Sequence, residues 1–288
     1  MNNVTNIEGV IMTTETPILI IGKNGKTGAR VNAQLNEKGI STLAVSRSST
    51  PIFDWNKPKT WACALKGIKQ AYVTYYPDLA VPSAESNLRN FVNAAKSQGV
   101  EHLVLLSGRG EGGAIRAENV LINSGLRWNV VRASWFFQNF SEAFLIEGIQ
   151  QGNLVLPVGD VLEPFIDCDD IAEVVVAALT RPELANQLFE VTGPQLMTFA
   201  DCVAQISEEV GRVITYTEVP LGSYLAQLKE IGLSDDELWL MNELFSKVLD
   251  GRNSQVSDGV QQALGRAPRR FADYAKAAHT SGAWTAAA

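Results

Sequence analysis

The sequence predicts an α/β fold in which a doubly wound parallel sheet carries helices on both faces. Short β-rich runs alternate with longer amphipathic runs through the first half of the chain. The β-rich runs are almost wholly apolar, as strands are when both faces of a parallel sheet are buried. Each is followed by a helical run, and this repeated order of strand and helix is typical of doubly wound sheets.

Five apolar or β-branched runs are the expected strands of the first half: 17–21, 43–45, 71–76, 102–106 and 128–132. The amphipathic runs that follow them are the expected helices: 26–38, 58–65, 84–97 and 116–124. In the first helix Val31 and Leu35 are four residues apart, so they share the face that packs on the sheet.

The pattern changes after Arg132. Residues 134–164 are irregular and rich in aromatic side chains, and 169–179 form a helix that returns to the sheet. Residues 198–251 are mostly helical, with a strand at 216–219. We expect this half to be a cap over the carboxyl ends of the strands, where open α/β sheets bind ligands.

A glycine-rich loop joins the first predicted strand to the first predicted helix, with the spacing G-x-x-G-x-x-G. Such glycines allow a tight turn, close approach of the backbone to a pyrophosphate and close packing of helix on strand, while the helix N-terminus directs free N–H groups at the anion. The alternative is a tight turn without a ligand. Because strand, loop, helix and second strand follow in the required order, we predict dinucleotide binding by Gly22, Asn24, Gly25, Lys26, Thr27 and Gly28.

The end of the second predicted strand distinguishes the two nicotinamide cofactors. An acidic residue there would hydrogen-bond the ribose 2′-hydroxyl of NAD and repel a 2′-phosphate. The sequence has Ser46, Arg47 and Ser48 instead, and a guanidinium between two hydroxyls suits a phosphate. We predict NADP(H). The alternative is that Arg47 is a solvated surface residue.

The chain divides into three expected segments without a clear linker. Residues 1–16 form a polar lead-in that lacks the charged start of a secretory signal, and translation begins at Met1 or Met12. Residues 17–133 are the expected dinucleotide-binding core. Residues 134–288 are the expected mixed region that rejoins the sheet and caps the substrate site.

The composition argues against several classes of protein. A net charge of −7 over 288 residues repels phosphate backbones, so we expect no nucleic-acid partner. The three cysteines are far apart and never form a C-x-x-C pair, which predicts neither a disulfide framework nor a metal site. No apolar run is long enough to span a bilayer. We therefore expect a cytoplasmic protein without a membrane partner.

Further motifs extend beyond the glycine loop: Phe53-Asp54-Trp55, Leu105-Leu106-Ser107, residues 132–140, 164–167, 169–172 and 265–268, with Phe271 and Trp284. Together they resemble the NmrA-like atypical short-chain dehydrogenases/reductases, and within them the festuclavine-synthase-like branch of ergot-alkaloid biosynthesis. The resemblance covers nearly the whole chain, and it implies a Rossmann-type fold and an oxidoreductase.

The resemblance also implies positions for the cofactor. It places Asp54 and Trp55 near the adenine, and Tyr75, Tyr76 and Pro77 beside the ribose and nicotinamide. Ser107 and residues 133–136 would lie on the nicotinamide side. Asp170 is expected to be a helix N-cap and not a catalytic group.

An aromatic cluster follows the fifth predicted strand: Trp135, Phe136, Phe137 and Phe140. We expect about half of these side chains to pack in the core. The others, with Arg109, are candidates to line a pocket for an apolar or aromatic substrate.

The sequence departs from the superfamily at the catalytic pair. Ordinary members reduce carbonyls with a Tyr-x-x-x-Lys pair, in which the lysine lowers the pKa of the tyrosine that protonates the developing alkoxide. None of the six tyrosines here has a lysine four residues later. Tyr76, Ser107 and Arg109 are weaker candidates to polarise a neutral carbonyl. No Gly-x-Ser-x-Gly motif supports a hydrolase.

Hydride transfer to an iminium carbon needs no proton donor, because the hydride itself discharges the positive charge. It needs a nicotinamide within reach, an apolar pocket and a carboxylate, such as Glu111, that favours the cation. We predict NADPH-dependent reduction of an imine, enone or quinone-like small molecule by a monomer or homodimer. Two alternatives stay open: a non-enzymatic NADP-binding redox sensor with a protein partner, and a redox-neutral isomerase or cyclase that retains the cofactor.

Overall fold

The computed structural model describes residues 16–142 and 144–285, so the predicted lead-in lies outside it apart from Thr16. Six parallel strands form the central sheet in the order β2-β1-β3-β4-β5-β7. Their bounds are Ile18–Ile21 (β1), Thr42–Val45 (β2), Gln70–Val73 (β3), His102–Gly108 (β4), Arg127–Ala133 (β5) and Gln187–Val191 (β7). The strand order reverses between β1 and β3, which confirms the predicted doubly wound sheet.

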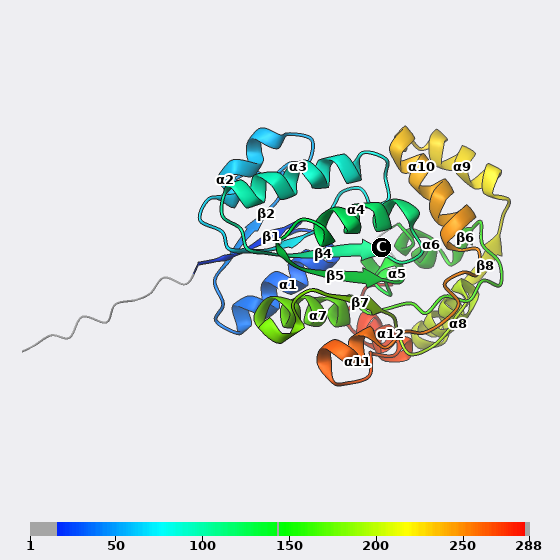
Figure 1. Ribbon diagram of the computed structural model, residues 1–288. Coiled ribbons are helices and arrows are strands. Elements are labelled where there is room, and N and C mark those ends of the chain that lie inside the picture. The colour runs from blue at the N-terminus through cyan, green and yellow to red at the C-terminus, as the bar shows by residue number, and fades with distance from the viewer. Residues whose placement is uncertain (1–15, 143, 286–288) are drawn as a thin grey trace, which may run out of the picture.

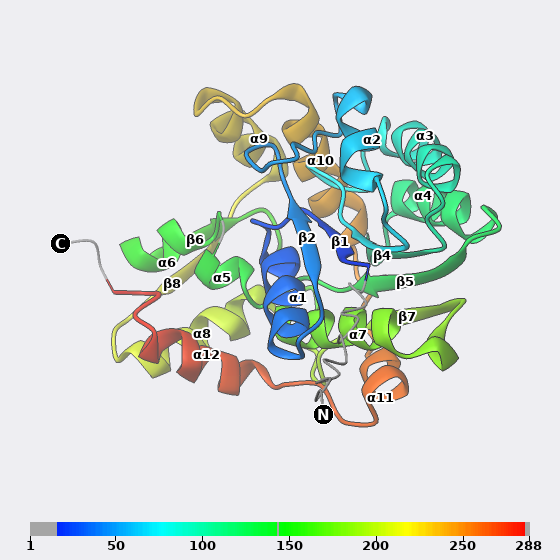
Figure 2. The same ribbon diagram turned by 90° about the vertical axis from the view of Figure 1, so that its left-hand side faces the viewer.

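Helices cover both faces of this sheet (Figure 1). One face carries α1 (Lys26–Glu37), α7 (Cys168–Thr180) and α11 (Gly259–Leu264). The other carries the 3₁₀ turn Pro58–Thr60 and helices α2 (Trp61–Leu65), α3 (Ala84–Ser97) and α4 (Gly112–Ile122). Figure 2 shows the same two layers from the edge at which β2 and α1 lie nearest the viewer.

The two faces of β1 enter two different apolar cores. Leu19 and Ile21 pack with the α3 and α4 side, whereas Ile18 and Ile20 pack with Val31 and the α7 side. Successive side chains of a strand point to opposite faces. The uninterrupted apolar run of β1 is therefore explained by burial on both sides.

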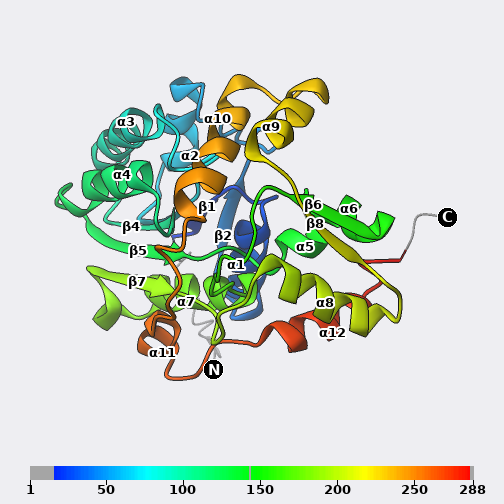
Figure 3. The same ribbon diagram turned by 90° about the vertical axis from the view of Figure 1, so that its right-hand side faces the viewer.

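The second half of the chain builds a third apolar core, whose buried members run from Phe137 to Trp284. Its elements are α5 (Asn139–Glu142), α6 (Ile146–Gln151), β6 (Asn153–Leu156), α8 (Phe199–Val210), β8 (Thr215–Glu218), α9 (Leu221–Glu230), α10 (Asp235–Glu243), a π-helical turn at Leu244–Val248 and α12 (Phe271–Thr280). The 3₁₀ turn at Pro182–Leu184 follows α7 and packs with the core on the α7 side. β6 and β8 form a separate two-stranded parallel sheet. Figure 3 looks onto the carboxyl edge of the central sheet, with α9 and α10 on one side and α8 and α12 on the other.

The structure corrects several predicted elements. β7 was not predicted, because Gln187 and Glu190 interrupt its apolar run and it pairs only with β5 at the sheet edge. Residues 134–164 are not simply irregular, since they contain α5, α6 and β6. The third strand ends at Val73, and α4 begins at Gly112, four residues before the predicted start.

The first turn of α4 packs closely against the loop that precedes α3. A Cβ at Gly113 would lie 2.1 Å from the backbone oxygen of Ala80, so only glycine fits there. Glycine has a low helix propensity, which is why the sequence pattern did not include this turn in a helix.

Within the described residues, no helix combines the length and apolar character needed to cross a bilayer.

Candidate functional site

The glycine loop turns from β1 into α1 at the carboxyl edge of the sheet. Gly22 has a φ of +86°, and a Cβ there would lie 2.2 Å from Thr74 Oγ1. A Cβ at Gly28 would lie 2.2 Å from the backbone oxygen of Gly22. These two glycines are therefore required by the turn and by helix packing. Gly25, the N-cap of α1, is exposed. A Cβ there would have its nearest neighbour, the backbone oxygen of Gly22, at 3.3 Å.

The N-terminus of α1 is suited to bind an anion. No side chain caps it, and its first turn contains no acidic residue. Its first N–H groups are consequently free to meet a phosphate. Asn24 is exposed beside this turn, and Lys26 is half-buried and lines the neighbouring cleft. The Thr27 hydroxyl is buried and accepts a hydrogen bond from Tyr72 at 2.9 Å, which fixes α1 against β3.

The end of β2 lies directly beside the glycine loop, because the N–H groups of Gly22 and Lys23 both donate to Val45 O. Ser46 and Ser48 are linked there by a hydrogen bond from Ser48 N to Ser46 Oγ of 3.2 Å. Arg47 is exposed, and its guanidinium carbon lies 4.9 Å from the centroid of the Tyr76 ring. The predicted 2′-phosphate residues and the predicted pyrophosphate loop thus share one corner of the sheet.

The residues predicted near the adenine are fixed by packing. Trp55 is buried, lies 4.8 Å from the Tyr75 ring between centroids, and donates from Nε1 to Thr74 O at 2.9 Å. Asp54 pairs with Lys57 at 3.5 Å. The Tyr75 hydroxyl accepts from Asn87 Nδ2 at 2.7 Å. The assignment of these residues to the adenine and ribose stays a prediction.

A cleft of about 300 Å³ opens at the carboxyl ends of β4 and β5, next to the glycine loop. It brings together eight of the predicted site residues: Lys26, Tyr75, Pro77, Ser107, Arg109, Glu111, Trp135 and Phe136. Apolar residues of α10 and the segment after it form a further wall: Leu240, Met241, Leu244 and Val248. Tyr76 is not among the lining residues, and 60% of its surface is exposed.

Ser107 and Arg109 are held by other residues of the protein. The Ser107 hydroxyl donates to Glu118 Oε1 at 2.5 Å, and Glu118 also pairs with Arg132 at 2.5 Å. Since a serine has one hydroxyl hydrogen, Ser107 offers only lone pairs to the cleft. Arg109 donates to Glu190 at 2.8 Å and to the backbone oxygen of Asn253 at 2.7 Å, which joins the end of β4 to the C-terminal segment.

Two acidic side chains, Asp78 and Glu111, lie on the same cleft and within hydrogen-bonding reach of one another. Burial raises the pKa of Glu111 well above its usual value, and the nearby charge of Asp78 raises it further. Burial also raises the pKa of Asp78, against the hydrogen bond that it accepts from Ala80 N at 2.7 Å. Two like charges this close disfavour ionisation of both groups, so the pair favours a state with one proton and one negative charge.

The predicted aromatic cluster divides as expected. Trp135 and Phe136 line the cleft, whereas Phe137 and Phe140 do not. Phe137 packs on Phe271 with ring centroids 5.1 Å apart, and Phe140 lies at the centre of the third core. Phe137 and Phe140 were candidates to line the substrate pocket, and the structure corrects this prediction, because both side chains belong to the core.

The structure also corrects the role expected of Asp170, which is not the N-cap of its helix. The N-cap of α7 is Asp167, whose Oδ1 accepts from Asp169 N at 2.8 Å. Asp170 lies in the first turn, is fully buried and accepts hydrogen bonds from Arg266 and Arg269. Asp167, Asp169 and Asp170 lie within four residues of sequence, so the motif alone did not distinguish the cap from the ion-pairing residue.

The sequence analysis missed Asp78 and the α10 wall. Asp78 directly follows Pro77, where the predicted cofactor segment ended, and its position at the carboxyl end of a strand could have marked it. The side chains of α10 carry no such signal, because only the tertiary fold brings them over β4 and β5.

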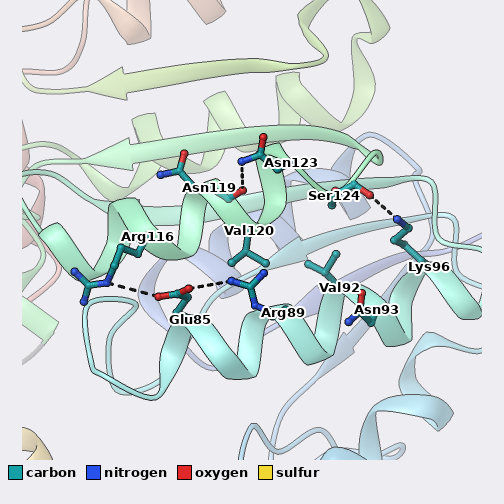
Figure 4. A pocket seen from close by; sticks show the side chains of 10 residues that line it. All are labelled: Glu85, Arg89, Val92, Asn93, Lys96, Arg116, Asn119, Val120, Asn123 and Ser124. Carbon is teal, nitrogen blue, oxygen red and sulfur yellow. Dashed lines mark hydrogen bonds and ion pairs between the residues drawn. The ribbon is translucent and has the colours of Figure 1, made fainter.

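A larger hollow of about 440 Å³ lies elsewhere, in a groove between α3 and α4 (Figure 4). Its side chains are mostly polar, and Glu85 pairs there with Arg89 at 2.9 Å and with Arg116 at 3.6 Å. The groove has neither the glycine loop nor the buried acids. The cleft is therefore the candidate functional site, although it is smaller.

The chain was compared with families, curated proteins and solved structures, and no family model matches it. It is 31% identical to an agroclavine dehydrogenase of Claviceps fusiformis over 276 positions, covering 89% of this chain and 95% of that protein. It is 30% identical to an NAD(P)H azoreductase of Xenophilus azovorans over 284 positions, covering 90% of this chain and 97% of that protein. The fold is similar to that of an NADPH-dependent quinone oxidoreductase of Escherichia coli, whose structure was solved with NADPH. The two superpose with a TM-score of 0.75 at 19% identity, covering 90% of this chain and 99% of that one. This last likeness concerns the fold alone.

Proposed function

Since the chain belongs to the NmrA-like family of atypical short-chain dehydrogenases/reductases, in the branch of the clavine dehydrogenases, we propose that it is an NADPH-dependent reductase of an apolar or aromatic small molecule. The acceptor is an imine, an enone or a quinone-like compound. The observation that carries this proposal is the single cleft in which the predicted nicotinamide-side residues meet apolar walls.

The residues present fit a dinucleotide phosphate. The uncapped N-terminus of α1 and the exposed Gly25 would receive the pyrophosphate, while Arg47 with Ser46 and Ser48 would receive the 2′-phosphate. The bound cofactor supplies a hydride. NADPH is proposed over NADH because the end of β2 has a guanidinium where NAD-binding proteins have an acid.

The walls of the cleft suit an apolar acceptor. Trp135, Phe136, Leu240 and Met241 supply apolar surface from two separate parts of the chain. Such walls exclude water, which protects a hydride donor and strengthens charge interactions inside the site. The negative charge of the Asp78 and Glu111 pair favours a cationic acceptor such as an iminium. The names of the two sequence relatives, a clavine dehydrogenase and an azoreductase, agree with acceptors that contain nitrogen.

The absence of a tyrosine–lysine pair from the sequence does not prevent this chemistry. The hydroxyl of Tyr75 is hydrogen-bonded to Asn87, and Tyr76 does not line the cleft. Reduction of an iminium needs only hydride delivery and a site that tolerates the positive charge. A tyrosine acid is thus unnecessary for this class of acceptor.

The test is consumption of NADPH in the presence of a panel of cyclic iminium ions, enones and quinones. We expect turnover with at least one class, and loss of that turnover in a variant with Gly25 replaced by valine. A protein that binds NADPH and consumes none with any acceptor would instead be a sensor or a redox-neutral enzyme.

A further inference from the structure

Beyond the hydride step, we infer that Asp78 and Glu111 form the proton donor of this site, with Glu111 giving its proton to neutral acceptors. This inference rests on the proposed function. It assigns to two carboxyl groups the role that the missing tyrosine–lysine pair has in the superfamily, and it adds neutral acceptors to the cationic ones.

The two side chains reach the cleft from different elements. Asp78 lies in the loop between β3 and α3, and Glu111 is the N-cap residue of α4. The carboxyl group of Glu111 packs over Gly108, where a Cβ would lie 2.2 Å from Oε2. Gly108 lines the same cleft. A glycine at this position is what allows the acid to lie against the end of β4, beside the predicted nicotinamide side.

The hydrogen bonds decide which of the two acids holds the proton. Glu111 is 6% exposed, and no group of the described residues hydrogen-bonds to its Oε2. Asp78 receives the N–H of Ala80 at 2.7 Å. A buried carboxylate without a donor is much less stable than one that has a donor. The proton therefore resides on Glu111, and the partnerless Oε2 is the oxygen from which it can be given to an acceptor and not to Asp78.

The surrounding charges keep this proton in place. The carboxylates of Asp78, Glu118 and Glu243 all raise the pKa of Glu111. The cations on the same cleft are Arg109 and Lys26, and Arg109 is already paired with Glu190. A carboxyl group whose ionisation is disfavoured in this way keeps the protonated form that a general acid needs.

In the proposed step, hydride adds to one atom of a neutral C=O, C=C–C=O or N=N group, and the π electron pair moves to the far oxygen, carbon or nitrogen. The Glu111 O–H bond breaks as the new bond to that atom forms, and Glu111 takes another proton from water after product leaves. The nicotinamide is oxidised and the acceptor is reduced by two electrons. An iminium needs no proton in this step.

Glu111→Gln and the control Glu85→Gln test the inference with two acceptors, a cyclic enone and an N-alkyl iminium. Glu85 is a carboxylate of the α3–α4 groove that pairs with Arg89 at 2.9 Å and does not line the cleft. We expect Glu111→Gln to lower turnover of the enone by about 100-fold or more, as removal of a general acid does, and to leave the iminium within about threefold. Glu85→Gln should keep both rates within about threefold.

A second readout needs no cofactor. At pH 7 the infrared difference spectrum of wild type minus Glu111→Gln, recorded on the free protein, should contain a neutral carboxyl band, and the difference spectrum of wild type minus Glu85→Gln should contain none. Equal loss on both acceptors, no loss on the enone, or an unchanged infrared band would each overturn the inference while the reductase assignment stands. If the wild type reduces neither acceptor nor any other of the panel, the proposed function itself fails, and the donor role fails with it.

Discussion

Glycine is required for different reasons at the positions of the β1–α1 loop, and this difference gives a prediction. Gly25 has φ −78° and ψ 160°, which any residue adopts, and a Cβ would meet only Gly22 O at 3.3 Å. Gly25→Val should therefore fold normally but place a branched side chain where the pyrophosphate approaches. Calorimetry should detect no NADPH binding, with a thermal midpoint within a few degrees of the wild type.

Gly28→Val is the matched control, because its Cβ would lie 2.2 Å from Gly22 O inside the packed turn. It should lower the thermal midpoint clearly. Unchanged NADPH affinity in Gly25→Val would remove the loop from the proposed cofactor site.

Arg47 determines the predicted choice of cofactor. A hydrogen bond to a charged group contributes about 1.5–3 kcal/mol, so Arg47→Ala should weaken NADPH roughly tenfold to a hundredfold and leave NADH nearly unchanged. Arg47→Asp should go further, since a carboxylate repels the phosphate. Titration of both cofactors checks this. The exposed Arg89, in the α3–α4 groove, is the control, and its replacement by alanine should change neither affinity.

If both cofactors weaken equally in Arg47→Ala, Arg47 is a surface residue. Its contact with the Tyr76 ring would then be its whole role.

Glu163 makes the stability of the protein depend on pH. It is buried behind Trp135, and burial raises its pKa to about 7 from a model-peptide value near 4.5. The folded state then binds more protons than the unfolded state between these values, so stability falls as pH rises from about 4.5 to 7. For one group the difference amounts to roughly 3 kcal/mol.

Glu163→Gln keeps an oxygen for the Trp135 N–H and removes the titration. Urea unfolding should find the variant more stable than the wild type by about 1–3 kcal/mol at pH 8.5 and nearly equal at pH 5. A stability difference that is constant across this range would contradict the assigned burial effect. His102, whose pKa is lowered by burial, titrates in both proteins and cancels in the comparison.

At the scale of the elements, two acids of α7 attach it to the C-terminal segment, and Asp170 is the fully buried one. Asp170 accepts hydrogen bonds from the side chain of Arg266 at 2.7 Å and from the backbone N–H of Arg269 at 2.7 Å. Both arginines also pair with Glu173. Asp170→Asn should lower the free energy of unfolding by roughly 2–4 kcal/mol, because two partly exposed cations lose their buried counter-charge.

The control for this helix is Asp169→Asn, because Asp169 pairs with Arg30 at its exposed surface. An exposed pair contributes about 0–1 kcal/mol, so this change should be small. Equal effects of the two substitutions on urea unfolding would show that the buried network does not hold α7 to the C-terminal segment.

The elements that the sequence predicted best are those whose pattern is local. β1, α1 and α3 follow directly from an apolar run, a glycine loop and a helical period, and α3 has the predicted bounds Ala84–Ser97. β7 carries no such pattern, since its place depends on pairing with β5 across the intervening α7. Tertiary pairing, and not local propensity, makes that segment a strand.

At the scale of the whole molecule, the candidate site joins parts of the chain that are far apart in sequence. The glycine loop and the end of β2 were predictable, because strand, loop and helix are consecutive there. Asp78 and Glu111 meet only because β3 and β4 are neighbours in the sheet, and Leu240 reaches the cleft only through the packing of α10. The candidate cofactor loop and part of the cleft wall, Trp135 and Phe136, were therefore predictable from the sequence, whereas Asp78 and the α10 side of the cleft were not.

The measurement that tests the central claim most directly follows the hydride itself. The protein is mixed with NADPH that carries deuterium at the transferable position of the nicotinamide, and with an iminium acceptor, and the product is analysed by mass spectrometry and NMR. The account predicts one deuterium per product molecule, at the former iminium carbon, and one NADP⁺ formed per product. A protein that binds this NADPH but yields no labelled product with any acceptor of the panel would contradict the claim that it is a reductase.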